Sequence, residues 1–269
     1  MVLTITPLVI ANAGSDEQIC QSPSVQSFVF ASRTTPASAA NSNGVFSWSA
    51  APLASGTFVN SSDLNPVFNI AAGFSGSITF TLNANSSGSC APGTNDFTLT
   101  VKPTPVVNPI ADLVICSGAT VPLISFSANT GGGETFNWAN DNAGIGLGAS
   151  GVGNIASFTA STYTGLSQLV ANISVTATLN GCTGPSRLFR ITINPEPVGL
   201  PVTATRCSDV LLGAGYTLNT NGTSVSAATY NIASITNLGG LTASAGAPAV
   251  GTGFAANVLV DDAWTNQTG

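Results

Sequence analysis

A short block of strand-forming residues occurs three times in this chain, at intervals of about one small domain. The block covers Val2 to Pro7, then Phe97 to Pro103, then Phe189 to Pro195. The first and second of these prolines are 96 residues apart, and the second and third are 92 residues apart. Repetition at this period indicates an array of similar modules, each a small folded unit packed next to its neighbours.

The repeat divides the sequence into two complete modules and two partial ones. Residues 1–13 are predicted to be the last strand of a preceding module and a linker. Residues 14–105 form the first repeat, 106–197 the second repeat, and 198–269 the N-terminal part of a third, truncated repeat. We therefore expect the chain to be a segment of a longer protein.

The composition predicts an all-β chain and excludes several classes of partner. Charged residues are only 6% of the sequence, against about 25% in ordinary soluble domains. Ser, Thr, Asn and Gly supply the polarity instead. Asn and Gly favour turns, Thr and Val favour strands, and the helix formers Lys and Glu are scarce. The five basic residues form no patch, so a nucleic-acid partner is excluded, and no apolar run reaches the roughly 18 residues of a membrane span. The basic residues are Arg33, Lys102, Arg187, Arg190 and Arg206.

The five cysteines keep step with the repeat. Cys20, Cys116 and Cys207 follow the three blocks, whereas Cys90 and Cys182 each stand 13 residues before the next proline. We expect one disulfide within each complete repeat, Cys20–Cys90 and Cys116–Cys182, with the partner of Cys207 outside this segment. A zinc site is the competing interpretation, but the chain has neither a CxxC pair nor any histidine. Stable disulfides indicate an oxidising compartment, which is the secreted, surface-exposed or periplasmic space.

Aromatic residues recur on one predicted strand of each repeat. Phe46 and Trp48 stand in the first repeat, Phe136 and Trp138 in the second, and Tyr230 takes this place in the third. They alternate with polar residues in mid-strand, so we predict that they belong to the core rather than to a ligand-stacking surface.

Alternation of apolar and polar residues predicts one long strand over Leu169 to Leu179, with Val170 as its only exception. The first repeat shows the same alternation from Ile78 to Asn85. Stretches rich in Gly and Asn, at 130–133 and 140–153, predict exposed loops. Prolines end the last strand of each repeat, and short stiff linkers of this kind favour a rod of modules.

The chemistry of known active sites is missing from the sequence. Without histidine the usual general base is lacking. The carboxylates are scattered over three repeats, and no pair suggests a glycosidase cleft. The pairs Asp16-Glu17 and Asp261-Asp262 lack any calcium-loop spacing, so we expect solvated turn residues. We therefore predict no enzymatic activity, no metal and no cofactor.

Several short motifs follow one another in the order of a known repeat family. They are the F-x-W strand, the Gly56-Thr57-Phe58 loop, the G-x-C turn, the strand ending in N-P-x-P-V, and the stretch Asp261 to Asn266. In this order they resemble the PKD-like, immunoglobulin-type repeats of giant surface proteins in Bacteroidota. The resemblance implies export by the type IX system, roles in adhesion, gliding or surface filaments, and no catalytic residues.

These observations predict a tandem array of immunoglobulin-like (PKD-like) β-sandwiches, each with about seven strands. The leading functional hypothesis is a structural and adhesive segment of a long extracellular adhesin or filament. Its expected partners are neighbouring repeats of the same chain, with a surface glycan, a protein or identical subunits as further candidates. The alternatives are a carbohydrate-binding accessory module and a self-assembling fibre subunit completed by strand donation.

Overall fold

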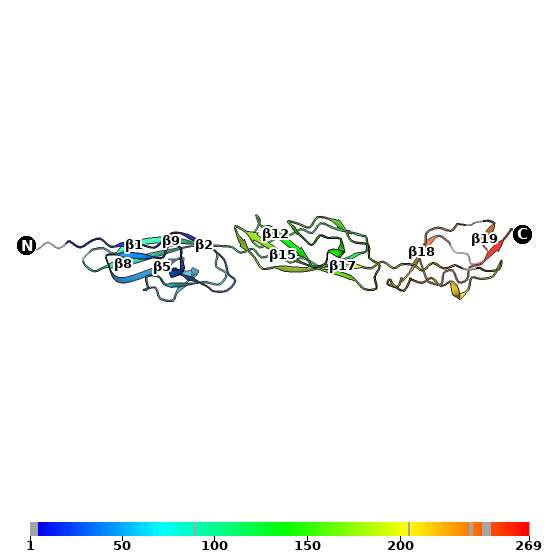
Figure 1. The fold of residues 1–269 in the computed structure, drawn as a ribbon, viewed down its shortest axis with the longest axis horizontal. Coiled ribbons are helices and arrows are strands. Elements are labelled where there is room, and N and C mark those ends of the chain that lie inside the picture. Colours follow the sequence, from blue (N-terminus) through cyan, green and yellow to red (C-terminus); the bar gives the residue numbers. More distant parts are fainter. Residues whose placement is uncertain (1–4, 89, 204, 237–238, 244–248, 269) are drawn as a thin grey trace, which may run out of the picture. The chain divides into compact units, whose positions relative to one another are not determined.

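Strands and short 3-10 turns are the regular elements of this protein (Figure 1). The computed structural model describes residues 5–88, 90–203, 205–236, 239–243 and 249–268. Within these residues there are 21 strands and no α-helix, so the predicted all-β class is confirmed. The 3-10 turns are η1 (Phe30–Ser32), η2 (Leu53–Ser55), η3 (Ala143–Ile145) and η4 (Ala214–Tyr216).

The chain divides into two compact units. The first, called unit 1, contains Met1–Pro109, Phe126–Asn137 and Val175–Arg187, and the second, unit 2, contains Ile110–Ser125, Trp138–Ser174 and Leu188–Gly269. The predicted repeat boundaries follow the sequence period rather than this division, and they stay predictions.

The first repeat is a sandwich of two sheets. One sheet has four strands in the order β2-β9-β8-β5 and the other has three in the order β3-β7-β6, while β1 pairs with β4. Seven strands in two sheets around one core is the immunoglobulin-like arrangement. The bounds are β1 (Ile10–Asn12), β2 (Glu17–Cys20), β3 (Gln26–Val29), β4 (Ser38–Ala40), β5 (Ser42–Ala51), β6 (Gly56–Phe58), β7 (Val67–Ile70), β8 (Gly76–Ser86) and β9 (Gly93–Lys102).

Aromatic rings fill the core between the two sheets of the first repeat. On β8, Ile78, Phe80 and Leu82 are fully buried, because alternate residues of a strand face the same side. The Phe80 ring stacks on Phe97 with centroids 5.0 Å apart, and Phe30 meets Phe80 edge-on at 5.1 Å. Each such ring pair stabilises the core by about 0.5–1.5 kcal/mol beyond its buried area.

A buried arginine fastens the start of the first repeat to this core. The guanidinium carbon of Arg33 lies 3.4 Å from the centroid of the Phe97 ring. Its Nε bonds Glu17 at 3.1 Å, and its terminal nitrogens donate to the carbonyls of Ala13 and Ser15 at 2.7 and 2.5 Å. Burial lowers the pKa of Arg33, and the hydrogen bond and charge of Glu17 act in the opposite direction. The arginine therefore serves as a structural cation.

The main sheet of the second repeat keeps the strand order of the first and adds two strands, β13 and β16. This sheet has the order β10-β17-β15-β12-β13, with β16 on β15, and β11 pairs with β14. Ile173 and Val175 of β15 and Ile191 and Ile193 of β17 are fully buried. Ile173 takes the place that Phe80 holds in the first repeat. The bounds are β10 (Leu113–Cys116), β11 (Thr120–Val121), β12 (Thr135–Asn140), β13 (Ser150–Val152), β14 (Phe158–Thr159), β15 (Leu169–Leu179), β16 (Cys182–Thr183) and β17 (Arg187–Asn194). The predicted tandem array of immunoglobulin-like sandwiches is confirmed.

The described part of the third repeat contains two pairs of strands. β18 (Tyr230–Ile232) pairs with β20 (Gly251–Phe254), and β19 (Leu241–Ala243) pairs with β21 (Trp264–Asn266). Within the described residues, no helix is both long and apolar enough to cross a bilayer.

Candidate functional site

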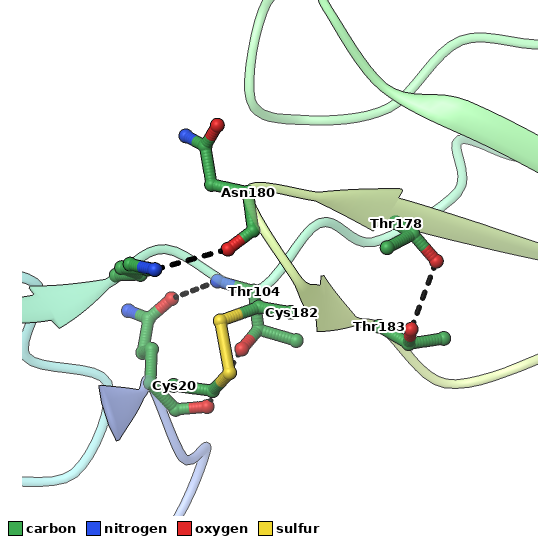
Figure 2. Close-up of a disulfide and its surroundings, with 8 residues drawn as sticks. Cys20, Thr104, Thr178, Asn180, Cys182 and Thr183 are labelled. Atoms are coloured by element: carbon green, nitrogen blue, oxygen red, sulfur yellow. Dashed lines mark hydrogen bonds between the residues drawn. A yellow bond between two sulfur atoms is a disulfide. The ribbon is translucent and has the colours of Figure 1, made fainter. Parts of the chain in front are cut away.

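A disulfide joins the first repeat to the second. Cys20 and Cys182 are 162 residues apart in sequence, and their Cα atoms lie 5.5 Å apart. Cys20 ends strand β2, and Cys182 begins strand β16 (Figure 2). Both cysteines belong to unit 1. The bond therefore forms a covalent connection between repeats that runs beside the peptide linker.

The predicted pairing Cys20–Cys90 is wrong, because the strands place these residues at opposite ends of the first repeat. β2 runs parallel to β9, with Cys20 opposite Lys102 at the end of β9. Cys90 instead precedes Gly93, where β9 begins. A strand of ten residues spans about 33 Å, whereas disulfide-linked Cα atoms lie roughly 4.4–6.8 Å apart. Cys90 is a free thiol in this structure.

The predicted pairing Cys116–Cys182 fails for the same reason. β10 runs parallel to β17, with Cys116 opposite Asn194 at the end of β17. Cys182 comes before Arg187, the first residue of that strand. Cys116 and Cys207 are free and exposed among the described residues.

A tight hairpin presents Cys182 to the first repeat. Leu179 of β15 lies opposite Cys182 of β16, so only two residues form the turn. Asn180 and Gly181 have φ angles of 50° and 84°. Such turns require positive φ at both central residues, which is why Asn-Gly is the preferred sequence. The hydroxyls of Thr178 and Thr183 form a hydrogen bond across the hairpin at 2.8 Å. The Asn180-Gly181 pair is a sequence signal that predicts this turn.

Hydrogen bonds around Cys20 hold the linker between the repeats. The backbone N–H of Gln21 donates to the carbonyl of Lys102 at 2.8 Å. Thr104 donates its N–H to the Gln21 side-chain oxygen at 3.1 Å and its hydroxyl to the Gln21 carbonyl at 2.8 Å. The Lys102 ammonium donates to the Asn180 carbonyl at 3.1 Å, as Figure 2 shows. Each bond contributes roughly 0.5–1.5 kcal/mol.

Close backbone packing adds to these bonds. A Cβ atom added to Gly184 would lie 1.6 Å from the carbonyl oxygen of Pro105, so only glycine permits this approach of the linker. Beyond the proline, Val106 exchanges bonds with Asn129: the Val106 N–H donates to the side chain at 2.8 Å, and the Asn129 N–H donates to the Val106 carbonyl at 3.1 Å. Gln21, Thr104 and Gly184 are the residues of this site that the sequence analysis missed.

The predicted core aromatics occupy different depths. Trp48 is 5% exposed and donates its ring N–H to the carbonyl of Leu64 at 3.1 Å. Phe136 is 9% exposed. The others are half-buried, namely Phe46, Trp138 and Tyr230. Their roles as core residues stay predictions.

Trp138 differs from Trp48 in its polar contacts. Its indole nitrogen is buried, and no described residue accepts its hydrogen bond. The ring instead packs on Gly151, where an added Cβ would lie 2.2 Å from the ring.

Acidic side chains do not converge anywhere in the described chain to form a metal site. We expected Asp261 and Asp262 to be solvated turn residues, and for Asp262 this is wrong. Its side chain is buried, and its oxygens have no hydrogen-bond partner among the described residues. Burial raises the pKa of Asp262, and the neighbouring charge of Asp261 adds to this.

Comparisons with known proteins give no family. No protein-family model and no curated protein matches the chain. Similar solved structures are tandem immunoglobulin domains. The N-terminal Ig1-2 module of the Drosophila receptor protein tyrosine phosphatase DLAR is 14% identical, with a TM-score of 0.25, over 70% of this chain and 100% of that chain. The Sidekick-1 immunoglobulin domains 1-4 are 13% identical, with a TM-score of 0.35, over 71% and 51%. Titin domains I67-I69 are 14% identical, with a TM-score of 0.36, over 66% and 62%. These scores are low, so the fold assignment rests on the strand order and register described above.

Proposed function

We propose that this chain is a load-bearing, non-catalytic segment of a long extracellular repeat protein, a surface adhesin or filament. The observation that carries the proposal is the disulfide between Cys20 of the first repeat and Cys182 of the second. A spacer between a cell and its target must transmit tension without unravelling. A bond between neighbouring repeats supplies this property, because tension passes through the bond instead of through the folded strands.

Two further observations support an extracellular location. Stable disulfides form in secreted and surface proteins and are rare in the cytosol. The order of motifs also resembles the PKD-like repeats of Bacteroidota surface proteins, which implies export by the type IX system and a role in adhesion, gliding or filaments. Antibody labelling of intact source cells tests the location. We expect label without permeabilisation, and label only after permeabilisation would contradict an extracellular segment.

A carbohydrate-binding role has less support. Such a surface needs a row of exposed aromatic rings, whereas every aromatic side chain in the described chain is buried or half-buried. The structural and contact role is therefore the better supported of the two.

Single-molecule stretching tests the load-bearing role directly. Tension applied at the chain ends reaches Cys20, crosses to Cys182 and leaves the 162 residues between them slack. A fully extended chain spans at most about 3.3–3.6 Å per residue, so the oxidised chain should extend roughly 550 Å less than the reduced chain. The C182S chain should extend like the reduced one, and the matched C90S chain like the oxidised wild type. Equal extension of the oxidised and reduced wild type would contradict the proposal.

A further inference from the structure

Cys90 occupies the place in the first repeat that Cys182 occupies in the second. Each stands 13 residues before the proline that ends its repeat, and each lies between the long alternating strand and the last strand. Cys182 is bonded, whereas Cys90 is a half-buried free thiol. The cysteine at this place in the repeat is therefore bonded in one repeat and free in the other.

The residues that precede the first repeat lie near Cys90. In the same way, the linker between the first and second repeats lies near Cys182. Thr6 and Lys102 both directly precede the proline of the repeated block. The Thr6 hydroxyl oxygen lies 3.0 Å from the Cys90 sulfur. Lys102 is the residue that Cys20 faces across the parallel strand pair. The sulfur of Cys90 thus lies beside the position at which the last strand of a preceding repeat ends.

The close backbone approach is also repeated. A Cβ atom added to Gly93 would lie 2.8 Å from the Val9 carbonyl oxygen, and one added to Gly184 would lie 1.6 Å from that of Pro105. Val9 and Pro105 both stand two residues after the proline of the block. Two independent contacts therefore place the chain before the first repeat in the geometry of the bonded junction.

Cys116 holds the place in the second repeat that Cys20 holds in the first. The N–H of Ser117 donates to the Asn194 carbonyl at 2.9 Å, as the N–H of Gln21 donates to that of Lys102 at 2.8 Å. Cys116 faces Asn194 across its parallel strand pair. It is thus placed at the end of the second repeat as Cys20 is placed at the end of the first.

We propose that Cys90 is a disulfide site for the first cysteine of a preceding repeat of the same kind. By the same rule, Cys116 bonds the second cysteine of the repeat that follows it. The two cysteines of each repeat then bond different neighbours, so the bonds overlap along the array. Each bond forms by thiol–disulfide exchange with a small-molecule disulfide such as oxidised glutathione. The two cysteines give up two protons and two electrons, and the oxidant is reduced to two thiols.

A chain with one added repeat tests the Cys90 site. A second copy of residues 8–103 is inserted between Pro7 and Leu8, so that Cys90 of the original repeat gains a preceding neighbour. The copy carries Q18N at an exposed position, which changes the mass of its Cys20 peptide, and C90S, which removes its own second cysteine. The chain is oxidised in a glutathione buffer, its free thiols are alkylated, and its peptides are mapped without reduction.

We expect two linked pairs, the original Cys20 with Cys182 and the marked Cys20 with Cys90. In the matched control, C20S in the copy should leave Cys90 fully alkylated. Formation of the Cys20–Cys182 bond in the same molecules reports that the bonded junction has folded. The proposal is overturned if Cys90 is alkylated in those molecules, or if it bonds the Cys20 of its own repeat. The load-bearing role of the Cys20–Cys182 bond would survive the first result, whereas the second result would remove that bond as well.

Discussion

The loop that carries Cys182 and the loop that carries Cys90 hold corresponding places in their repeats, but the two cysteines differ in covalent state. Each has a glycine against a linker carbonyl, and each sulfur lies near the end of a repeated block. Of these two, Cys182 is bonded to the first cysteine of a neighbouring repeat, and Cys90 has no such partner among the described residues. The difference teaches that a cysteine of this array is bonded or free according to the neighbouring repeat, and not according to its own.

The largest expected difference between the two loops comes from removing each sulfur. The C182S substitution should lower the free energy of unfolding by about 2–5 kcal/mol, the usual effect of losing a native disulfide. C90S should change the free energy of unfolding by less than about 0.5 kcal/mol, because no disulfide is lost. Denaturant unfolding followed by tryptophan fluorescence measures both. Equal effects of the two substitutions would remove the distinction between the loops.

A smaller difference should come from the glycines. G184A should cost about 1–3 kcal/mol, because its new methyl group must displace the Pro105 carbonyl at 1.6 Å. G93A should cost less, since its nearest contact is 2.8 Å. G148A is the matched control, because its added Cβ meets nothing nearer than 4.0 Å. The free energies of unfolding of the three variants rank their losses of stability. A G184A variant as stable as the wild type would show that the linker does not pack closely against this loop.

Substitution of the threonine near each loop should produce a smaller difference in stability. T104V removes the hydroxyl that bonds the Gln21 carbonyl at 2.8 Å, which should cost about 0.5–1.5 kcal/mol. T6V removes only a contact with the Cys90 sulfur, so we expect a smaller change. Denaturant midpoints of the two variants decide between them, and a larger loss from T6V would reverse the comparison.

Of these substitutions, D262N in the third repeat should have the smallest effect on the two cysteine loops. Its raised pKa means that folding favours the protonated carboxyl. The protection of the third repeat's backbone amides from hydrogen exchange should be greatest at acidic pH. It should fall as the pH rises through the raised pKa of Asp262. D262N should abolish this dependence and leave the Cys20–Cys182 junction unchanged. Hydrogen exchange measured by region against pH tests this, and an unchanged pH profile in D262N would contradict the assignment.

Much of the fold could be predicted from the sequence because strand periodicity is local. The strand predicted from Leu169 to Leu179 is β15, with the same bounds. The prolines at 103 and 195 directly follow the last residues of β9 and β17. These signals need only neighbouring residues, so no tertiary information was required.

The cysteine pairing could not be predicted from spacing alone. Spacing locates Cys20 and Cys90 within one repeat, but the direction of β2 relative to β9 decides which end each occupies. A parallel first strand puts the first cysteine at the far end of the repeat. Long-range pairing of this kind leaves no local pattern.

A loop prediction failed for a similar reason. Residues 140–153 are rich in Gly and Asn and were predicted to be exposed, yet Ile145 is fully buried and Ser150–Val152 form β13. Asn140 is also buried and donates to the Leu147 carbonyl at 3.0 Å. Isolated apolar residues among glycines carry no periodicity, so only the folded context shows that they belong to the core.

The most direct measurement is a peptide map of the oxidised 269-residue chain without reduction. The structure predicts one linked pair, Cys20 with Cys182, and alkylated peptides for the three other cysteines. A map that linked Cys20 to Cys90 and Cys116 to Cys182 would contradict it, because the bonds would then lie within repeats and no covalent connection would join one repeat to the next.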